Sequence, residues 1–114
     1  MADPLTAAEI IASLTQVSGA LDLAFYNSMN VESRNSVDIS EFSTTTVRLS
    51  EAIRVLQRVP PAKMESLFSE FTDEFTADLN TFNDKGKSFV ERFRAAQILI
   101  GYAATVINRS GLRG

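Results

Sequence analysis

Neither cysteine nor histidine occurs in this chain of 114 residues. Without cysteine there are no disulfides, no thiolate nucleophiles and no sulfur-ligated metals. Without histidine the chain lacks the commonest acid–base group and metal ligand, which excludes serine–histidine triads, the usual zinc sites and carboxylate–histidine di-iron sites. Sequence spacing brings no pair of the remaining reactive side chains together. We therefore expect no enzymatic activity, no metal site and no cofactor.

Long apolar runs and a strong net charge are also missing. The longest uncharged stretches, residues 10–21 and 95–108, are shorter than the roughly 20 apolar residues that a membrane-spanning helix needs. The formal net charge is -3, so no overall positive field attracts nucleic acid. Asp3 stands where a secretory signal would carry a basic residue, and Arg34 is the first basic residue. We expect a cytoplasmic protein that does not bind nucleic acid.

What the sequence does contain is helical periodicity, because apolar residues recur every three or four positions in four segments. The expected helices cover residues 6–28, 37–59, 61–82 and 88–108. Helices of about 20 residues joined by short links predict an all-α fold, an antiparallel four-helix bundle. The length suits a single domain that spans residues 1–114.

Local signals mark some of the helix boundaries. Thr6 is followed by Glu9 in capping-box spacing, and the Pro60-Pro61 pair separates the second segment from the third. Inside the second segment, the β-branched residues at positions 44–47 favour extended backbone. The apolar spacing continues through them, so we expect one helix, with a break near Thr44 left open.

Phenylalanine is concentrated in the third and fourth segments, at helical spacing. The series consists of Phe68, Phe71, Phe75, Phe82, Phe89 and Phe93. Such a seam is most simply a packed core, to which each ring contributes a large apolar area. The alternative is the lining of a pocket between helices that carries a small apolar ligand.

The third segment also carries a one-sided acidic face formed by Glu70, Asp73, Glu74 and Asp78. Carboxylates of this kind are ligands for hard cations such as calcium. Here, however, spacings of three and four only stack them along a helix, without the wrapping, glycine-kinked loop of a calcium site. We interpret the cluster as a solvated helix face.

The last segment is uncharged from residue 95 to residue 108 and apolar nearly all the way round. A helix of this character is either central in a bundle or covered by another chain or by lipid. We expect a symmetric dimer, with Gly101 at a close approach of two helices. The candidate interface consists of Leu99, Ile100, Gly101, Ala103 and Ile107.

One resemblance is confined to the first quarter of the chain. Residues 1–8, with the sequence Met-Ala-Asp-Pro-Leu-Thr-Ala-Ala, lead into the small and apolar stretch 10–21. This opening resembles that of fungal HeLo-like domains, the N-terminal helical bundles of incompatibility and NLR-type immune receptors. Some members of that family insert their first helix into membranes, so the resemblance implies a membrane-active cell-death module.

Taken together, these patterns predict a non-enzymatic helical-bundle protein that works in interaction or assembly. It would act by self-association or by docking a protein partner on an apolar helix face. Two alternatives remain: a HeLo-like module that contacts membranes, and a carrier of a small apolar ligand in the bundle core.

Overall fold

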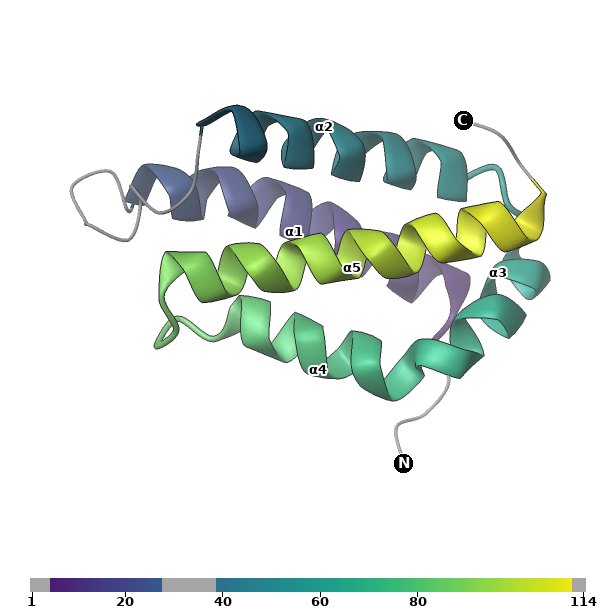
Figure 1. Cartoon of the computed structure of the whole chain (residues 1–114). Coiled ribbons are helices and arrows are strands. Elements are labelled where there is room, and N and C mark those ends of the chain that lie inside the picture. Colours follow the sequence, from purple (N-terminus) through teal and green to yellow (C-terminus); the bar gives the residue numbers. More distant parts are fainter. Residues whose placement is uncertain (1–4, 28–38, 112–114) are drawn as a thin grey trace.

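The computed structural model describes residues 5–27 and 39–111, which form four helical rods without a strand (Figure 1). The elements are α1 (Ala7–Asn27), α2 (Ile39–Leu56), α3 (Pro61–Phe68), the 3-10 helix η2 (Ser69–Phe71), α4 (Thr72–Asn83) and α5 (Phe89–Ser110). The predicted all-α bundle is thereby confirmed. The predicted helix ends at residues 28 and 37 lie outside the described residues.

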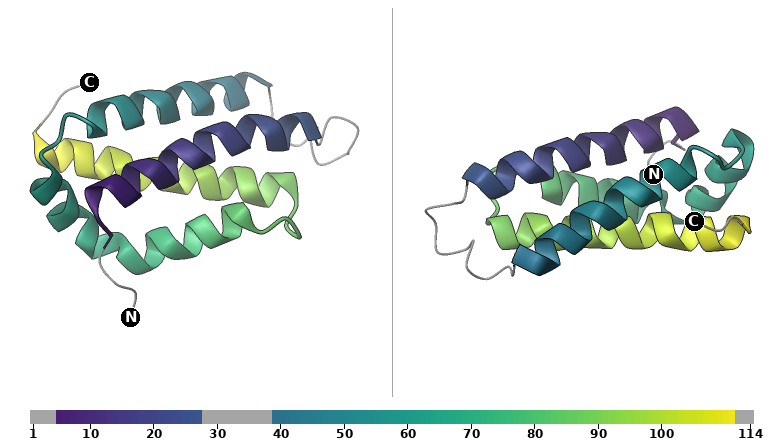
Figure 2. Two further views of the ribbon diagram at one scale, coloured as in Figure 1. Left: turned by 180° about the vertical axis from the view of Figure 1, so that it is seen from behind. Right: turned by 90° about the horizontal axis from the view of Figure 1, so that it is seen from above.

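Successive rods run in opposite directions, as the sequence colours in Figure 1 and Figure 2 show. The rod made of α3, η2 and α4 counts as one of the four. α2 and α5 lie side by side and run in the same direction, and α5 also packs along α4. Because α5 contacts α1, α2, α3 and α4, it is the central helix of the bundle.

Two helices begin at side-chain caps that satisfy unpaired backbone N–H groups. At α1 the predicted capping box is confirmed: the Glu9 N–H donates to Thr6 Oγ1 at 3.1 Å, and the Thr6 N–H donates to Glu9 Oε1 at 2.9 Å. At α5 the hydroxyl of Ser88 accepts from the Glu91 N–H at 3.2 Å. α5 ends at Ser110 and is capped by Gly111, whose φ of 82° is the left-handed conformation that favours glycine.

α2 passes without a break through the threonine run, so the helix is continuous at Thr44. Two of the hydroxyls donate to carbonyls of the preceding turn, Thr45 to Glu41 at 2.8 Å and Thr46 to Ser43 at 2.9 Å. These bonds are compatible with continuous helix. α2 ends at Leu56, three residues before the predicted end.

The single helix predicted over residues 61–82 is wrong, because η2 divides it into α3 and α4. At the junction Phe71 has φ -116° and ψ 7°, outside the helical region. Phe68 and Phe75, on either side of it, make an edge-on contact with ring centroids 5.5 Å apart, and both rings are almost completely enclosed. Because the apolar spacing continues across the junction, the periodicity that predicted one helix does not register the local change to 3-10 geometry.

The core consists of the inward-facing side chains of all four rods. Its largest fully buried members are Ile10, Leu14, Val17, Leu21, Leu49, Leu56, Met64, Phe68, Phe75, Phe82, Phe93 and Leu99. Phe71 lies at its edge, where it stacks on Tyr102 with centroids 5.4 Å apart. The predicted phenylalanine seam is therefore largely a packed core.

We expect Phe75→Ala to lower the free energy of unfolding by about 3–5 kcal/mol, the usual cost of truncating a buried aromatic. Phe75 is fully buried, whereas Phe71 is partly exposed, so Phe71→Ala should cost distinctly less. Urea denaturation followed by circular dichroism measures both. An equal or larger loss for Phe71→Ala would contradict this description of the core.

Candidate functional site

A groove runs along the seam between α2 and α5. The hollow at its more apolar end has a volume of about 440 Å³. The residues that line it are Arg48, Glu51, Ala52 and Val55 of α2 and Gln97, Ile100, Gly101, Ala104, Ile107 and Asn108 of α5. Most of the floor is aliphatic and small, and the polar residues stand at the rim.

The groove continues toward the start of α2 as a more polar hollow of about 450 Å³. Hydroxyl groups of Ser40, Thr44 and Thr45 line this end. A smaller hollow of about 190 Å³ lies between the two. Because Arg48 and Gln97 line all three hollows, the groove is continuous, with an apolar end, a polar end and Arg48 at their junction.

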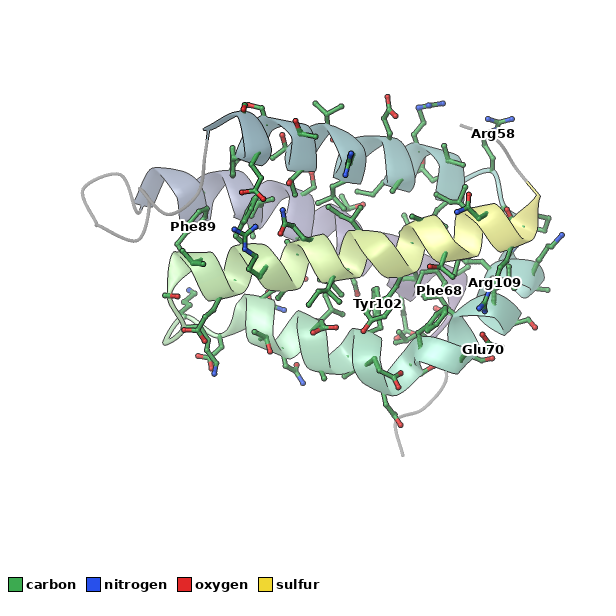
Figure 3. The ribbon with its side chains drawn as sticks, viewed as in Figure 1. Arg58, Phe68, Glu70, Phe89, Tyr102 and Arg109 are labelled. Atoms are coloured by element: carbon green, nitrogen blue, oxygen red, sulfur yellow. The ribbon has the colours of Figure 1, made fainter. Side chains whose placement is uncertain are left out.

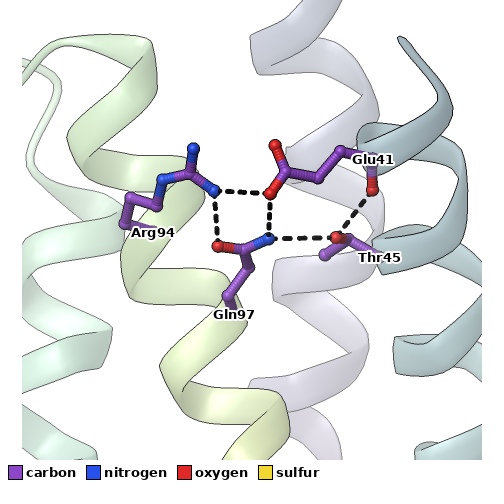
Figure 4. Close-up of polar contacts among 4 residues, drawn as sticks. All are labelled: Glu41, Thr45, Arg94 and Gln97. Atoms are coloured by element: carbon purple, nitrogen blue, oxygen red, sulfur yellow. Dashed lines mark hydrogen bonds and ion pairs between the residues drawn. The ribbon is translucent and has the colours of Figure 1, made fainter. Parts of the chain in front are cut away.

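A hydrogen-bonded network fixes the two walls of the polar end to each other (Figure 4). Arg94 Nη1 donates to Glu41 Oε2 at 2.9 Å and to Gln97 Oε1 at 2.7 Å. Gln97 Nε2 donates to Glu41 Oε2 and to Thr45 Oγ1, both at 3.3 Å. The bonds from Arg94 and Gln97 hold the pKa of Glu41 below its ordinary value. The network sets the position of α5 against α2.

Arg48 is not part of this network. Within the described residues, no hydrogen bond or ion pair joins it to another side chain, although Arg94 on the facing helix is paired. Arg54, later in α2, and Arg58, in the turn after it, are also exposed and unpaired within that part of the chain. Glu51, in the apolar end of the groove, is unpaired among the described residues too, so α2 and the turn after it present a net positive charge of three arginines against one carboxylate.

The opposite side of α5 is tied to η2 and α4 by contacts that use the predicted acidic face (Figure 3). The Tyr102 hydroxyl donates to Asp78 Oδ2 at 2.9 Å, and Arg109 forms an ion pair with Glu70. Burial, followed by the bond to Asp78, raises the pKa of Tyr102 to about 12. In the described part of the chain no three acidic residues gather as metal ligands. Two of the four predicted acids thus hold helices together.

The predicted interface residues are divided between the core and the groove. Leu99 and Ala103 are fully buried inside the bundle, so their prediction as surface contacts is wrong. Ile100 and Ile107 are partly exposed and line the groove. Gly101 lines it too, and a Cβ added there would meet nothing within 4 Å, so no described helix of the chain itself crosses closely at Gly101. The predicted close approach in a dimer stays a prediction.

The six phenylalanines proposed for a ligand pocket do not line the groove. Phe68, Phe75, Phe82 and Phe93 are at most 1% exposed. Phe89 and Phe93 stack with centroids 5.8 Å apart, and Phe42 of α2 covers both rings. Their apolar surface is therefore used in packing.

The first helix, on which the membrane-active alternative depends, buries its apolar side. Ile10, Leu14, Val17 and Leu21 are at most 1% exposed. Among the described helices, none combines the length and the apolar character that crossing a bilayer requires. Insertion of α1 would therefore require its core contacts to open.

Sequence reasoning did not find the groove, because its walls lie more than 40 positions apart along the chain. None of Arg48, Ala52 and Gln97 was predicted as a site residue. The available signal was a stripe on each helix: positions 41, 44, 48, 51 and 55 of α2, and 97, 101, 104 and 108 of α5.

Comparison with known proteins finds no matching family model, no matching curated protein and no matching solved structure. The resemblance to HeLo-like domains stays a prediction, and residues 1–4 of that motif lie outside the described residues. The functional argument therefore depends on the groove and on the charges beside it.

The Tyr102 contact predicts a specific alkaline sensitivity. The pKa of Tyr102 is about 12 in the folded chain, against about 10 in an unfolded one. Because the folded state holds the phenolic proton more tightly, this contribution to stability is complete below about pH 10 and disappears as the pH rises through about 12. Between about pH 10 and 12 the free energy of unfolding should therefore fall less for Tyr102→Phe than for the wild type. Urea-denaturation midpoints measured at a series of pH values test this, and an equal fall in the two proteins would contradict it.

Proposed function

We propose that this chain is a non-enzymatic helical-bundle interaction module that binds a helix of a protein partner in the groove between α2 and α5. The observation that carries the proposal is the groove itself, with its aliphatic floor and polar rim. Amphipathic helices bind proteins by laying an apolar face in a groove of this kind. The cytoplasmic location stays a prediction.

The dimensions of the groove support a helix as the ligand. At 1.5 Å per residue, the lining positions span about 16 Å of α5, from Gln97 to Asn108, and about 22 Å of α2, from Ser40 to Val55. A helix of three to four turns has about this length. Small molecules are more often held in enclosed cavities, whereas this groove is open along the surface, which favours a docked helix over a carried ligand.

The outward side of α5 also supports the docking of a partner helix. Although α5 packs against every other rod, its exposed residues between Arg94 and Arg109 carry no charge. Ile98 is 47% exposed, and Gly101 and Ala104, also exposed, lie in the groove. Apolar surface bordered by polar residues is typical of interaction sites. Small side chains there allow the backbone of a partner helix to come close.

A designed peptide tests the proposal. The probe is a synthetic helix of about 15 residues, with leucine and alanine three and four positions apart on one face and serine and glutamine elsewhere. We expect its addition to shift the amide NMR signals of Ile100, Gly101 and Ala104 in a saturable way, because these residues line the groove.

Two matched variants show whether the groove is responsible. Ala104→Tyr fills the groove and should abolish the shifts, whereas Ala77→Tyr places the same ring on the exposed side of α4 and should leave them unchanged. Binding that survives Ala104→Tyr, or shifts that map to another surface, would refute the groove as the docking site.

A further inference from the structure

We infer that the partner helix is acidic, with a carboxylate beside its apolar face that pairs with Arg48. This inference rests on the proposed function and specifies the chemistry of the partner. Three observations support it. They are the pairing of the positive side chains within the chain, the position of Arg48 in the groove, and the poor fit of a second copy of the chain.

Most described cationic side chains have a partner within the chain. Lys63 and Arg92 donate to the carbonyl oxygens of Ser110 and Phe82, at 3.1 and 2.7 Å. Lys87, Arg94 and Arg109 form ion pairs with the acids Glu91, Glu41 and Glu70. The cations that remain without a partner among the described residues are Arg48, Arg54, Arg58 and Lys85. Three of these four belong to α2 or to the turn that follows it.

Arg48 has the position that a charged anchor in a binding groove requires. It lines both the aliphatic end, beside Ile100, and the hydroxyl-bearing end, beside Thr44 and Thr45. The Thr45 hydroxyl already donates to the Glu41 carbonyl, so an incoming carboxylate would meet the planar donors of the guanidinium together with the Thr44 hydroxyl. The flanking helix face would cover the aliphatic floor. Arg54 and Arg58, farther along the chain, would add attraction for an acidic partner before contact.

A second copy of this chain does not supply such a helix. The acidic helix of the bundle is α4, with Asp73 and Glu74 exposed, but its apolar residues Phe75 and Phe82 are fully buried. α4 therefore has no free apolar face to lay in a groove. The partner is accordingly a different protein with an acidic amphipathic helix.

The experiment compares three versions of the designed peptide that share one apolar face and differ only beside it, with glutamate, glutamine or lysine. With the full chain at low salt we expect the glutamate version to bind about five- to tenfold more tightly than the glutamine version, as for a partly exposed ion pair with added long-range attraction. The lysine version should bind most weakly. Raising the salt should reduce the difference.

Two charge-reversing variants locate the effect. Arg48→Glu should abolish or invert the preference for glutamate, because it removes the cation of the groove. Lys85→Glu makes the same change of charge in the turn before α5 and should leave the preference intact.

Each outcome separates this inference from the proposed function. Equal binding of the three peptides in the groove, or a glutamate preference that persists in Arg48→Glu, would overturn the acidic partner and leave the docking function standing. Absence of any groove binding by all three would overturn both. Concentration-dependent shifts of the groove residues in the chain alone would identify a second copy as the occupant and overturn the inference.

Discussion

The packing of α5 against all the other rods is the constraint on which the rest of the structure depends. Phe93, Leu99 and Ala103 are fully enclosed, so the buried side of this one helix contributes to every part of the core. The caps at Ser88 and Gly111 fix where the helix begins and ends. The network among Glu41, Arg94 and Gln97 then sets its position against α2, and Tyr102 with Asp78 sets it against α4.

The same constraint produces the surface that we assign to binding. With one side of α5 in the core and another held against α4, the residues left beside α2 are small or aliphatic and form the floor of the groove. The α2 wall adds Arg48, whose charge finds no partner within the described chain. An apolar floor next to an unneutralised cation favours an amphipathic acidic helix over a neutral one or a second copy.

The sequence was informative where structure is determined locally. The periodicity located all four rods, and the Thr6 and Glu9 spacing indicated the first cap, because both depend on neighbours within a few residues. The break at η2 could not be predicted in this way, since Phe68 and Phe75 keep the apolar spacing of one continuous helix across it. The groove joins distant positions such as Arg48 and Gln97. A helix that is apolar all round also lacks the polar face that would have separated buried Leu99 from exposed Ala104.

The central claim is that α5 divides its residues between the core and the groove. Of two adjacent residues, Ala103 lies in the core and Ala104 lines the groove. Since the chain contains no cysteine, single replacements report accessibility without interference. In folded protein, a thiol reagent should modify Ala104→Cys at a rate close to that of a free thiol. Ala103→Cys should react only when urea unfolds the chain, because Ala103 is fully buried. Equal rates at the two positions, or protection of Ala104→Cys, would contradict the account.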